Sequence, residues 1–361
     1  MRYKILAINP GSTSTKIAVY EDEREVWSRS ILHSTEDLLN YHRLFDQLLM
    51  RYEKIVDTIT SHDIPMANLS AVVGRGGLLP PVKSGAYRIN RDMLLQLEEA
   101  PVLEHAANLG APLAFRVAEQ LGIPAYIYDP VTVDEMIDVV RITGRKSIKR
   151  FGKGHNLNMR AAALRYAREN GLDYHQLNLV VTHLGGGITA SLHSQGRIID
   201  MISDDEGAFS PERAGGLPIQ KLIGECMQGG VTYAEMMRRV QRLGGMMDHL
   251  VTTDLREVEH RILEGDQYAK LVYDAMALNV SKDIARLSTV VNGRVDAIIL
   301  TGGIAYSRLF TAQITERVKW IAPVKILAGE NEMEALAHGA LRVLRGEEQA
   351  HTYTFQPLEN S

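Results

Sequence analysis

The chain has 361 residues, of which 45% are hydrophobic and 23% charged, a composition typical of a globular protein with room for two domains. Its 40 Lys and Arg against 44 Asp and Glu give a net charge of −4, which offers nothing to attract a nucleic acid. The single cysteine, Cys226, excludes an internal disulfide framework and a metal site built from several cysteines.

The chain enters a predicted strand at residue 3, without the basic and then apolar segment that is typical of a secretory leader. No apolar run is long enough to span a bilayer. We therefore expect a cytoplasmic protein that has neither a membrane nor a nucleic acid among its partners.

Residues 3–20 consist of two apolar, β-branched runs on either side of a turn made almost entirely of Asn, Pro, Gly, Ser and Thr. This pattern predicts a strand, a tight turn and a second strand. The small side chains, free N–H groups and hydroxyls of the turn, together with Lys16, suit the binding of an anion. An ordinary polar hairpin loop is the alternative, and one such turn does not decide between them.

A third strand is predicted over residues 25–33, and apolar residues at helical spacing then predict a helix from Thr35 through Ile59. Residues 69–74 form a short buried strand that runs into a loop rich in Gly and Pro. Arg75 therefore stands at the C-terminal end of a strand, where it could reach a ligand. A surface arginine without such a role is the alternative.

Residues 114–121 are predicted to be helical, and residues 124–128 form a strand that ends at Asp129. A carboxylate at the end of a strand is a common magnesium ligand, although it is as often a turn or capping residue. A further helix over residues 158–170 ends at Gly171.

The second half of the chain repeats the opening pattern. Residues 178–184, 188–193 and 196–202 are predicted strands, and the turn between the first two contains Gly185, Gly186 and Gly187. A repeat at this long a spacing indicates two similar half-molecules. We expect an α/β protein with domains over residues 1–175 and 176–361, each presenting a phosphate-sized loop to a cleft between them.

The remainder of the chain is mostly helical. A buried strand over residues 295–300 is followed by Gly302 and Gly303 and then by a helix, so that a ligand could approach bare backbone there. The other predicted elements are helices over residues 218–227, 233–243, 254–263, 266–291, 307–320 and 332–344 and a strand over residues 324–327.

Several of these segments together resemble the acetate kinase family, within the actin/Hsp70/sugar-kinase fold. The segments are residues 9–16, 74–77, 129, 182–187, 253–258, 301–303 and 329–332, in that order along the chain. The resemblance implies two ribonuclease-H-like domains that close over MgATP and a short carboxylate. It also implies reversible transfer of the ATP γ-phosphoryl group to that carboxylate, giving an acyl phosphate and ADP.

The resemblance also implies roles for individual residues. The magnesium ion would be held or oriented by Asn9, Asp129 and Glu332, and His105 would lie near the substrate. His105 could instead be a structural cap, and Glu332 only an acid favoured by a helix N-terminus. The implied ATP/ADP contacts are Asn9, Gly11, Ser12, Thr13, Ser14, Lys16, Gly185, Gly186 and Gly187 on the two phosphate loops, and Gly302, Gly303 and Ile304 at the adenosine.

The chemistry of the implied reaction can be weighed separately. A carboxylate is already ionised at pH 7, so the reaction needs no general base. It needs charge neutralisation and alignment around the transferring phosphoryl group. Arg75 and Arg256, from opposite halves, fit a fork on the carboxylate and the phosphoryl oxygens, and His183, at a strand end, fits a donor to the transition state. We assign no role to the other histidines, among them His33 and His155.

The length of the acyl chain is predicted from Gly76 and Gly77. Acetate kinases that resemble this chain carry a bulkier, Val-containing segment after the equivalent arginine. Two glycines there would deepen the acyl pocket and favour C4 and branched C4–C5 acids, by roughly 0.8 kcal/mol for each buried methylene. Acetate or propionate is the alternative acceptor.

A protein of a different class remains possible on this fold, namely a chaperone-like or filament-forming ATPase. The length of the chain disfavours a chaperone, which needs an appended peptide-binding domain. The family resemblance further suggests a homodimer or higher homo-oligomer. The helices over residues 233–243 and 266–291 are candidate contact surfaces, although both could belong to the core.

Overall fold

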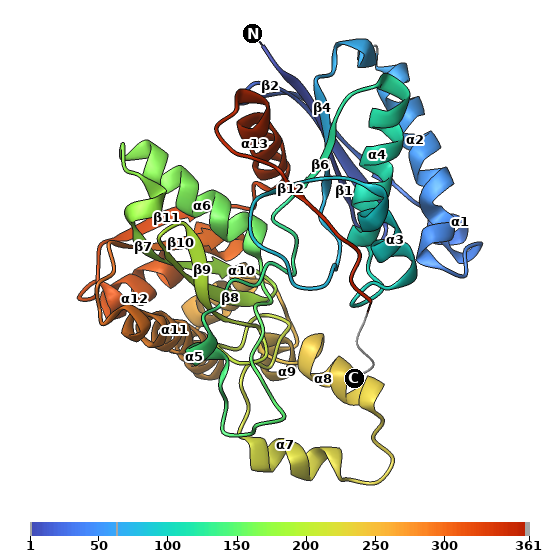
Figure 1. Ribbon diagram of the computed structural model, residues 1–361. Coiled ribbons are helices and arrows are strands. Elements are labelled where there is room, and N and C mark those ends of the chain that lie inside the picture. The colour runs from blue at the N-terminus through green and yellow to red at the C-terminus, as the bar shows by residue number, and fades with distance from the viewer. Residues whose placement is uncertain (1, 63, 358–361) are drawn as a thin grey trace. The chain divides into compact units, whose positions relative to one another are not determined.

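The computed structural model describes residues 2–62 and 64–357 (Figure 1). The chain forms two compact units, one built from the segment up to Asp134 and the segment from Asn331 onward, the other from Glu135–Glu330. From the sequence we expected residues 135–175 in the first domain and residues 331–361 in the second. The structure assigns each of these segments to the other unit. The reason is packing, because α6 (Asn156–Glu169) contacts β7 and β10 of the second unit, and α13 (Glu332–Arg345) contacts β1, β4 and β6 of the first.

The first unit is built on a seven-stranded sheet in the order β12-β5-β6-β4-β1-β2-β3. Ile5, Leu6, Ala7 and Ile8 of the central strand β1 are fully buried, which explains the unbroken apolar run in the sequence. The strands are β1 (Lys4–Pro10), β2 (Ser14–Glu21), β3 (Arg24–Leu32), β4 (Ala71–Arg75), β5 (Ala86–Arg88), β6 (Ala125–Tyr128) and β12 (His351–Thr352).

The helical run predicted from Thr35 to Ile59 is interrupted in the structure. The first helix ends at Asn40, whose N–H group donates to the carbonyls of Asp37 and Leu38, and a short 3₁₀ turn precedes the second helix. The helices of this unit are α1 (Thr35–Leu39), α2 (Leu48–Ser61), α3 (Arg91–Glu99), α4 (Gly110–Leu121) and α13, with 3₁₀ turns η1 (Leu44–Gln47), η2 (Met66–Asn68) and η3 (Ala106–Leu109).

The second unit is built on a five-stranded sheet in the order β11-β10-β7-β8-β9. Its strands are β7 (Asn178–Leu184), β8 (Ile188–Ser194), β9 (Arg197–Ile202), β10 (Ala297–Gly302) and β11 (Val324–Ala328). Its helices are α5 (Asp138–Arg141), α6, α7 (Ile219–Cys226), α8 (Tyr233–Gln241), α9 (Met246–Leu250), α10 (Leu255–Leu263), α11 (Gln267–Ser288) and α12 (Arg308–Val318), with 3₁₀ turns η4 (Tyr174–Gln176), η5 (Thr289–Val291) and η6 (Gly303–Tyr306).

The two sheets confirm the predicted internal repeat. In each unit three antiparallel strands, β1-β2-β3 or β7-β8-β9, are followed by two strands that add in parallel to the first, β4 and β6 or β10 and β11. Both second-to-third strand pairs also carry a register shift, at Val19/Tyr20 and at Leu192/His193. The loops that follow β1 and β4 therefore have counterparts in the loops that follow β7 and β10.

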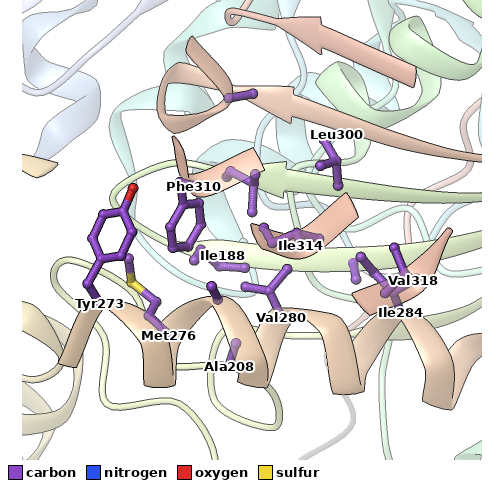
Figure 2. Packing of buried hydrophobic residues seen from close by; sticks show 14 of the residues in the cluster. Ile188, Ala208, Tyr273, Met276, Val280, Ile284, Leu300, Phe310, Ile314 and Val318 are labelled. Carbon is purple, nitrogen blue, oxygen red and sulfur yellow. The ribbon is translucent and has the colours of Figure 1, made fainter. Parts of the chain in front are cut away.

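The core of the second unit lies between its sheet and the helices α11 and α12 (Figure 2). Val280 and Ile284 of α11 pack with Ile314 of α12, and all three side chains are fully buried. The rings of Tyr273 and Phe310 meet edge to face, with centroids 5.2 Å apart. One face of α11 is therefore core, and this packing fixes the strands that carry the site described below.

Candidate active-site residues

The loop between β1 and β2 is a tight turn with an exposed crest. The N–H group of Gly11 donates to the carbonyl of Ser14 at 2.7 Å, which closes the turn, and the side chains of Ser12 and Thr13 are exposed. Asn9 and Lys16 are direct neighbours across the two strands. The anion-binding groups predicted from the sequence thus gather on one loop.

Three predicted residues meet at one end of the first sheet. Arg75 is the last residue of β4, Asn9 lies in the adjacent strand β1, and Glu332 is the first residue of α13. One carboxylate oxygen of Glu332 lies 2.5 Å from Nη1 of Arg75, and the other accepts a hydrogen bond from Nδ2 of Asn9 at 2.7 Å. Segments more than 250 residues apart in sequence therefore build one charged cluster, in which Asn9 and Glu332 are separated by 323 positions.

Asp129 and His105 lie in the same unit. Asp129 directly follows β6, is 1% exposed, and accepts a hydrogen bond from the N–H group of Gly85 at 2.7 Å. Its positive φ of 40° is unusual for a residue other than glycine. His105 caps the turn η3 through Nδ1, which accepts from the N–H group of Ala107. Loss of solvent around its imidazole and the nearby Arg75 cation lower the pKa of His105.

The explanation proposed above for acyl-chain length is wrong, because Gly76 and Gly77 face packed atoms. A Cβ atom on Gly77 would lie 2.6 Å from Cδ2 of Leu97 and 2.8 Å from Cα of Asn108. On Gly76 it would lie 2.5 Å from Cβ of Pro130. These glycines allow close packing of the loop and leave no open pocket floor in their own place.

The loop between β7 and β8 is the counterpart in the second unit. The N–H group of Gly185 donates to the carbonyl of Gly187 at 3.2 Å. The carbonyl of Gly186 accepts from Oγ of Ser210 at 2.6 Å and from the N–H group of Glu212 at 3.2 Å. A Cβ atom on Gly185 would lie 2.7 Å from Nε2 of His183, so glycine is needed for the loop to pass this histidine.

His183 is 2% exposed and held on several sides. Its Nδ1 accepts a hydrogen bond from Nδ2 of Asn158 at 2.8 Å, an arrangement that assigns the proton to Nε2. Nε2 in turn lies 3.3 Å from Oε1 of Glu330. His183 is therefore oriented as a hydrogen-bond donor, the capacity for which the sequence selected it.

Two residues beside His183 were missed by the sequence reasoning. The imidazole of His155 stacks on that of His183 with centroids 3.8 Å apart and planes inclined by 10°, and its Nδ1 lies 2.9 Å from Oγ1 of Thr189. The side chain of Arg213 lies next to Gly187 and pairs with Asp204 at 3.2 Å. The available signal was the spacing of His155 and Asn158, which puts both on the first turn of α6.

A cavity of about 830 Å³ opens in the second unit beside this loop. Gly185, Gly186, Gly303 and Ile304 line it, so both predicted nucleotide loops of this unit border one space. Among the described residues, and apart from Gly303 and its chain neighbours, no atom lies within 4 Å of the place where a Cβ atom on Gly303 would stand. The volume falls in the range of ordinary small-molecule sites.

Arg256 lines the same cavity as Gly303 and Ile304. Its side chain is 90% exposed, and its guanidinium grips Asp254 with Nη2 at 2.6 Å from Oδ2 and Nε at 3.0 Å from Oδ1. An exposed pair of this kind is easily exchanged for another anionic partner. The structure therefore places Arg256 with the residues expected at the nucleotide, while its role on the transferring phosphoryl group stays a prediction.

The predicted magnesium ligands are only partly gathered. Within the described residues, no three His, Cys, Asp or Glu side chains form a group able to hold a metal ion. Magnesium commonly binds through one or two carboxylates together with phosphate oxygens and water, so the pair of Asn9 and Glu332 fits a partial shell. Asp129 as a third member stays a prediction.

The repeated strand order, with a small-residue loop after the first strand of each sheet, defines a protein of the actin/Hsp70/sugar-kinase fold. Solved structures agree. The acetate kinase of Porphyromonas gingivalis matches with a TM-score of 0.80 at 17% identity, covering 95% of this chain and 100% of that one. A propionate kinase from Francisella tularensis subsp. tularensis SCHU S4 matches with a TM-score of 0.73 at 18% identity, covering 93% and 98%.

Sequence comparison narrows this class to one family. The acetokinase family model matches residues 140–332. Butyrate kinase 1 of Clostridium acetobutylicum is 47% identical over 353 residues, which cover 97% of this chain and 99% of that protein. A probable butyrate kinase 2 of Caldanaerobacter subterraneus subsp. tengcongensis is 46% identical over 352 residues, with coverage of 97% and 99%. The chain belongs to the acetokinase family.

Proposed function

We propose that butyrate or a branched C4–C5 acid is the acceptor of this short-chain carboxylate kinase, which transfers the ATP γ-phosphoryl group reversibly to give an acyl phosphate and ADP. The observation that carries the proposal is 47% identity, over nearly the full length of both chains, to a protein named butyrate kinase 1. Acetate or propionate is the alternative acceptor, since the solved structures of similar fold bear those names.

Arg75 is the residue we assign to the acceptor carboxylate. Its guanidinium already pairs with a carboxylate, that of Glu332, at 2.5 Å. A substrate carboxylate presents the same charge and the same two oxygens to the same donors. If the substrate carboxylate replaced that of Glu332 at Arg75, Glu332 would keep its contact with Asn9, and these two residues are where we expect magnesium.

His183 is the residue we assign to the transferring phosphoryl group. Its Nε2–H is a donor because Asn158 occupies Nδ1, and stacking on His155 restricts rotation of the ring. A fixed donor of this kind stabilises negative charge as it spreads over the phosphoryl oxygens. Alignment and charge neutralisation suffice, because the carboxylate nucleophile is already ionised.

In the first unit, the turn between β1 and β2 would contact phosphate, and Asn9 and Glu332 would contact magnesium. In the second unit, the glycine loops would contact the nucleotide. The glycines that border the cavity let backbone N–H groups approach phosphate oxygens, and Ile304 would lie along the nucleoside. Arg256, which lines the same cavity, would donate to the transferring phosphoryl group. Asn9, Asp129 and Glu332 would hold magnesium, which neutralises charge on the phosphate oxygens when bound. A chaperone-like or filament-forming ATPase would need none of the acceptor chemistry proposed for Arg75.

The direct test is turnover of ATP with acids from C2 to C5 in the presence of hydroxylamine, which traps an acyl phosphate as a coloured hydroxamate. We expect hydroxamate in proportion to ADP, with kcat/KM highest for C4 or branched C4–C5 acids. ATP hydrolysis without hydroxamate for every acid would instead support the ATPase of the other class. An optimum at acetate would leave a carboxylate kinase with a different acceptor.

We also propose a homodimer or higher homo-oligomer in the cytoplasm, where ATP is available as the phosphoryl donor. The second unit offers an apolar surface for self-association on α7, where Ile219, Ile223 and Met227 are 72%, 55% and 79% exposed. Their spacing of four residues puts them on one face of the helix. In the described residues, no helix combines the length and apolar character needed to cross a membrane.

A further inference from the structure

Arg51 of α2 is fully buried and reaches the loop between β1 and β2. Its Nη1 donates to the carbonyls of Gly11 at 2.9 Å and Ser14 at 3.2 Å, and its Nη2 donates to the carbonyl of Ser12 at 3.0 Å. The remaining direction is filled by Oε1 of Gln47, which lies 3.1 Å from Nε and 2.9 Å from Nη2. One guanidinium thus donates hydrogen bonds to three backbone carbonyls of a single turn.

The charge of this guanidinium has no acidic partner among residues 2–62 and 64–357. Burial lowers the pKa of Arg51 to about 10, so the group stays charged at neutral pH. A buried cation without a counter-ion is costly, and oxygen dipoles offset only part of that cost. The positive charge of Arg51 is therefore only partly compensated beneath the loop.

The groups around Arg51 add no second unpaired positive charge, because His33 is neutral and Lys54 is paired with an acid. His33 lies next to it, with Nε2 2.8 Å from Oγ1 of Thr15, the same hydroxyl that accepts from Nη1 of Arg51 at 3.1 Å. Burial, then Arg51 and Lys54, lower the pKa of His33 to about 4, so this imidazole is neutral at pH 7. Lys54 lies one turn along α2 and pairs with Asp37 at 2.9 Å.

The hydrogen bonds to Arg51 also set which way the loop faces. The carbonyl of Thr13 accepts from the N–H group of His33 at 2.9 Å, so all four carbonyls from Gly11 to Ser14 have donors on the protein side. In the described part of the chain, the N–H groups of Ser12 and Thr13 donate to no protein acceptor. These N–H groups belong to exposed residues and are available to an anion.

We propose that Arg51 is a positioning residue for phosphoryl binding, which turns the carbonyls of this loop inward, leaves its N–H groups for phosphate oxygens, and adds a positive charge without an acidic partner beneath them. The inference rests on the proposed function for the identity of the anion. The loop of the second unit achieves its shape differently, since a hydroxyl and an N–H group bind the carbonyl of Gly186. The buried cation is thus a feature of the first loop.

Two substitutions separate charge from geometry. Arg51→Lys keeps the charge, but one ammonium cannot reach the carbonyls of Gly11, Ser12 and Ser14 together. Arg51→Gln removes the charge as well. The matched control is Lys54→Gln, which removes a cation from the next turn of α2, where the side chain contacts Asp37 and not the loop.

The readout is equilibrium binding by calorimetry to three probes: butyryl phosphate, butyrate and inorganic triphosphate. Butyryl phosphate and butyrate share an acyl chain and differ in the phosphoryl group. We expect Arg51→Lys to weaken binding of both phosphoryl-bearing probes roughly tenfold and Arg51→Gln by up to about 100-fold, the range of residues that orient a binding group. Butyrate affinity should stay within about twofold in both variants, and Lys54→Gln should bind all three probes as the unmodified protein does.

Wild-type affinity for butyryl phosphate and triphosphate in either folded Arg51 variant would overturn the proposal and leave Arg51 as a purely structural residue. Equal loss of butyrate binding would overturn it too, because it would mean general disorder of the site. If only Arg51→Lys folds, as circular dichroism would show, that variant decides alone. Triphosphate binding does not depend on the acceptor, so failure of the carboxylate kinase proposal would appear separately, as absence of hydroxamate from the unmodified protein.

Discussion

At the scale of single residues, the sequence predicted which side chains belong to the site better than it predicted which residues contact them. Asn9, Arg75 and Glu332 come together as one cluster, and His183 is oriented as a donor. His155 was missed because its spacing from Asn158 indicates a shared helix end but names no partner, and its stacking on His183 exists only after α6 packs against β7. Polar contacts between distant segments are set by tertiary packing, which local sequence does not encode.

The donors assigned to the transferring phosphoryl group and the acceptor should act mainly on turnover. We expect His183→Ala and Arg75→Ala each to lower kcat by about 10²–10³-fold, because such donors are strongest when charge develops on the reacting oxygens. ATP affinity should change little in both. The measurement is steady-state kinetics with calorimetric ATP binding, and a change confined to KM for ATP would remove that residue from its assigned role.

The orientation of His183 gives a sharper test. Asn158→Asp would place a carboxylate at Nδ1 and draw the proton there, away from Nε2, so kcat should fall roughly as far as in His183→Ala. Asn158→Ala is the control, because it removes the amide donor without adding a carboxylate that holds the proton on Nδ1, and it should slow turnover less. Nitrogen NMR of the imidazole checks the tautomer, and an Nε2-protonated ring in a slow Asn158→Asp variant would contradict this explanation.

Another buried histidine predicts how stability depends on pH. His193 is fully buried between the hydroxyls of Tyr174 and Ser191, and burial lowers its pKa to about 3. The unfolded chain therefore binds a proton below about pH 6.5 that the folded chain does not, so stability is present above pH 6.5 and is lost as the pH falls. Between pH 6.5 and 5 the loss is about 2 kcal/mol, at 1.36 kcal/mol per unit.

Urea unfolding at pH 7 and pH 5 checks this value. His193→Gln keeps a polar side chain without the titrating group, so its free energy of unfolding should be lower at pH 7 but should fall less between the two pH values. An unchanged pH dependence in this variant would assign the acid sensitivity to other groups.

At the scale of elements, glycine turns were the most informative signal and also the most misleading. The turns after β1 and β7 revealed the repeat because both join antiparallel strands in the same way. Gly76 and Gly77 are glycines for another reason, because neighbouring side chains and backbone fill the space that a Cβ atom would need. Short elements such as β5 (Ala86–Arg88) escaped prediction because pairing with β6 defines them, and not their own three residues.

Gly77→Ala therefore tests packing. The added Cβ atom would lie 2.7 Å from Oδ1 of Asn108 and 2.8 Å from its Cα, so we expect a loss of about 1–3 kcal/mol in the free energy of unfolding. The ratio of kcat/KM for butyrate to that for acetate should stay near its original value. Gly144→Ala is the control, because in the part of the chain that the structure describes no atom beyond its chain neighbours lies within 4 Å of its Cβ position. A shifted acid preference in Gly77→Ala would restore the acyl-pocket role of Gly77.

At the scale of the whole molecule, the repeat was predictable but the course of the chain through it was not. The spacing of strands and turns predicted the three antiparallel strands that open each half, and the structure adds two parallel strands to each set in the same order. The return of the chain to its first unit at Asn331 could not be predicted, because α13 has the pattern of any amphipathic helix until its partners are known. The contacts of α13 with β1, β4 and β6 place it in the first unit, and they also bring Glu332 to Arg75.

Self-association is the last property that belongs to this scale, and α7 offers the means to test it. None of its residues is buried within the chain, and the spacing of four residues puts the large apolar side chains of Ile219 and Ile223 on one exposed face. Burial of such side chains at a contact between copies would stabilise an oligomer by about 1.5–3 kcal/mol each.

We expect the unmodified protein to sediment as a dimer or larger species at micromolar concentration, and Ile219→Glu with Ile223→Glu to sediment as a smaller one with the same circular dichroism. Leu263→Glu, at an equally exposed position at the end of α10, should leave sedimentation unchanged. A monomer in the unmodified protein would refute the oligomer itself, and an unaltered oligomer in the α7 variant would move the contact to another surface of the chain.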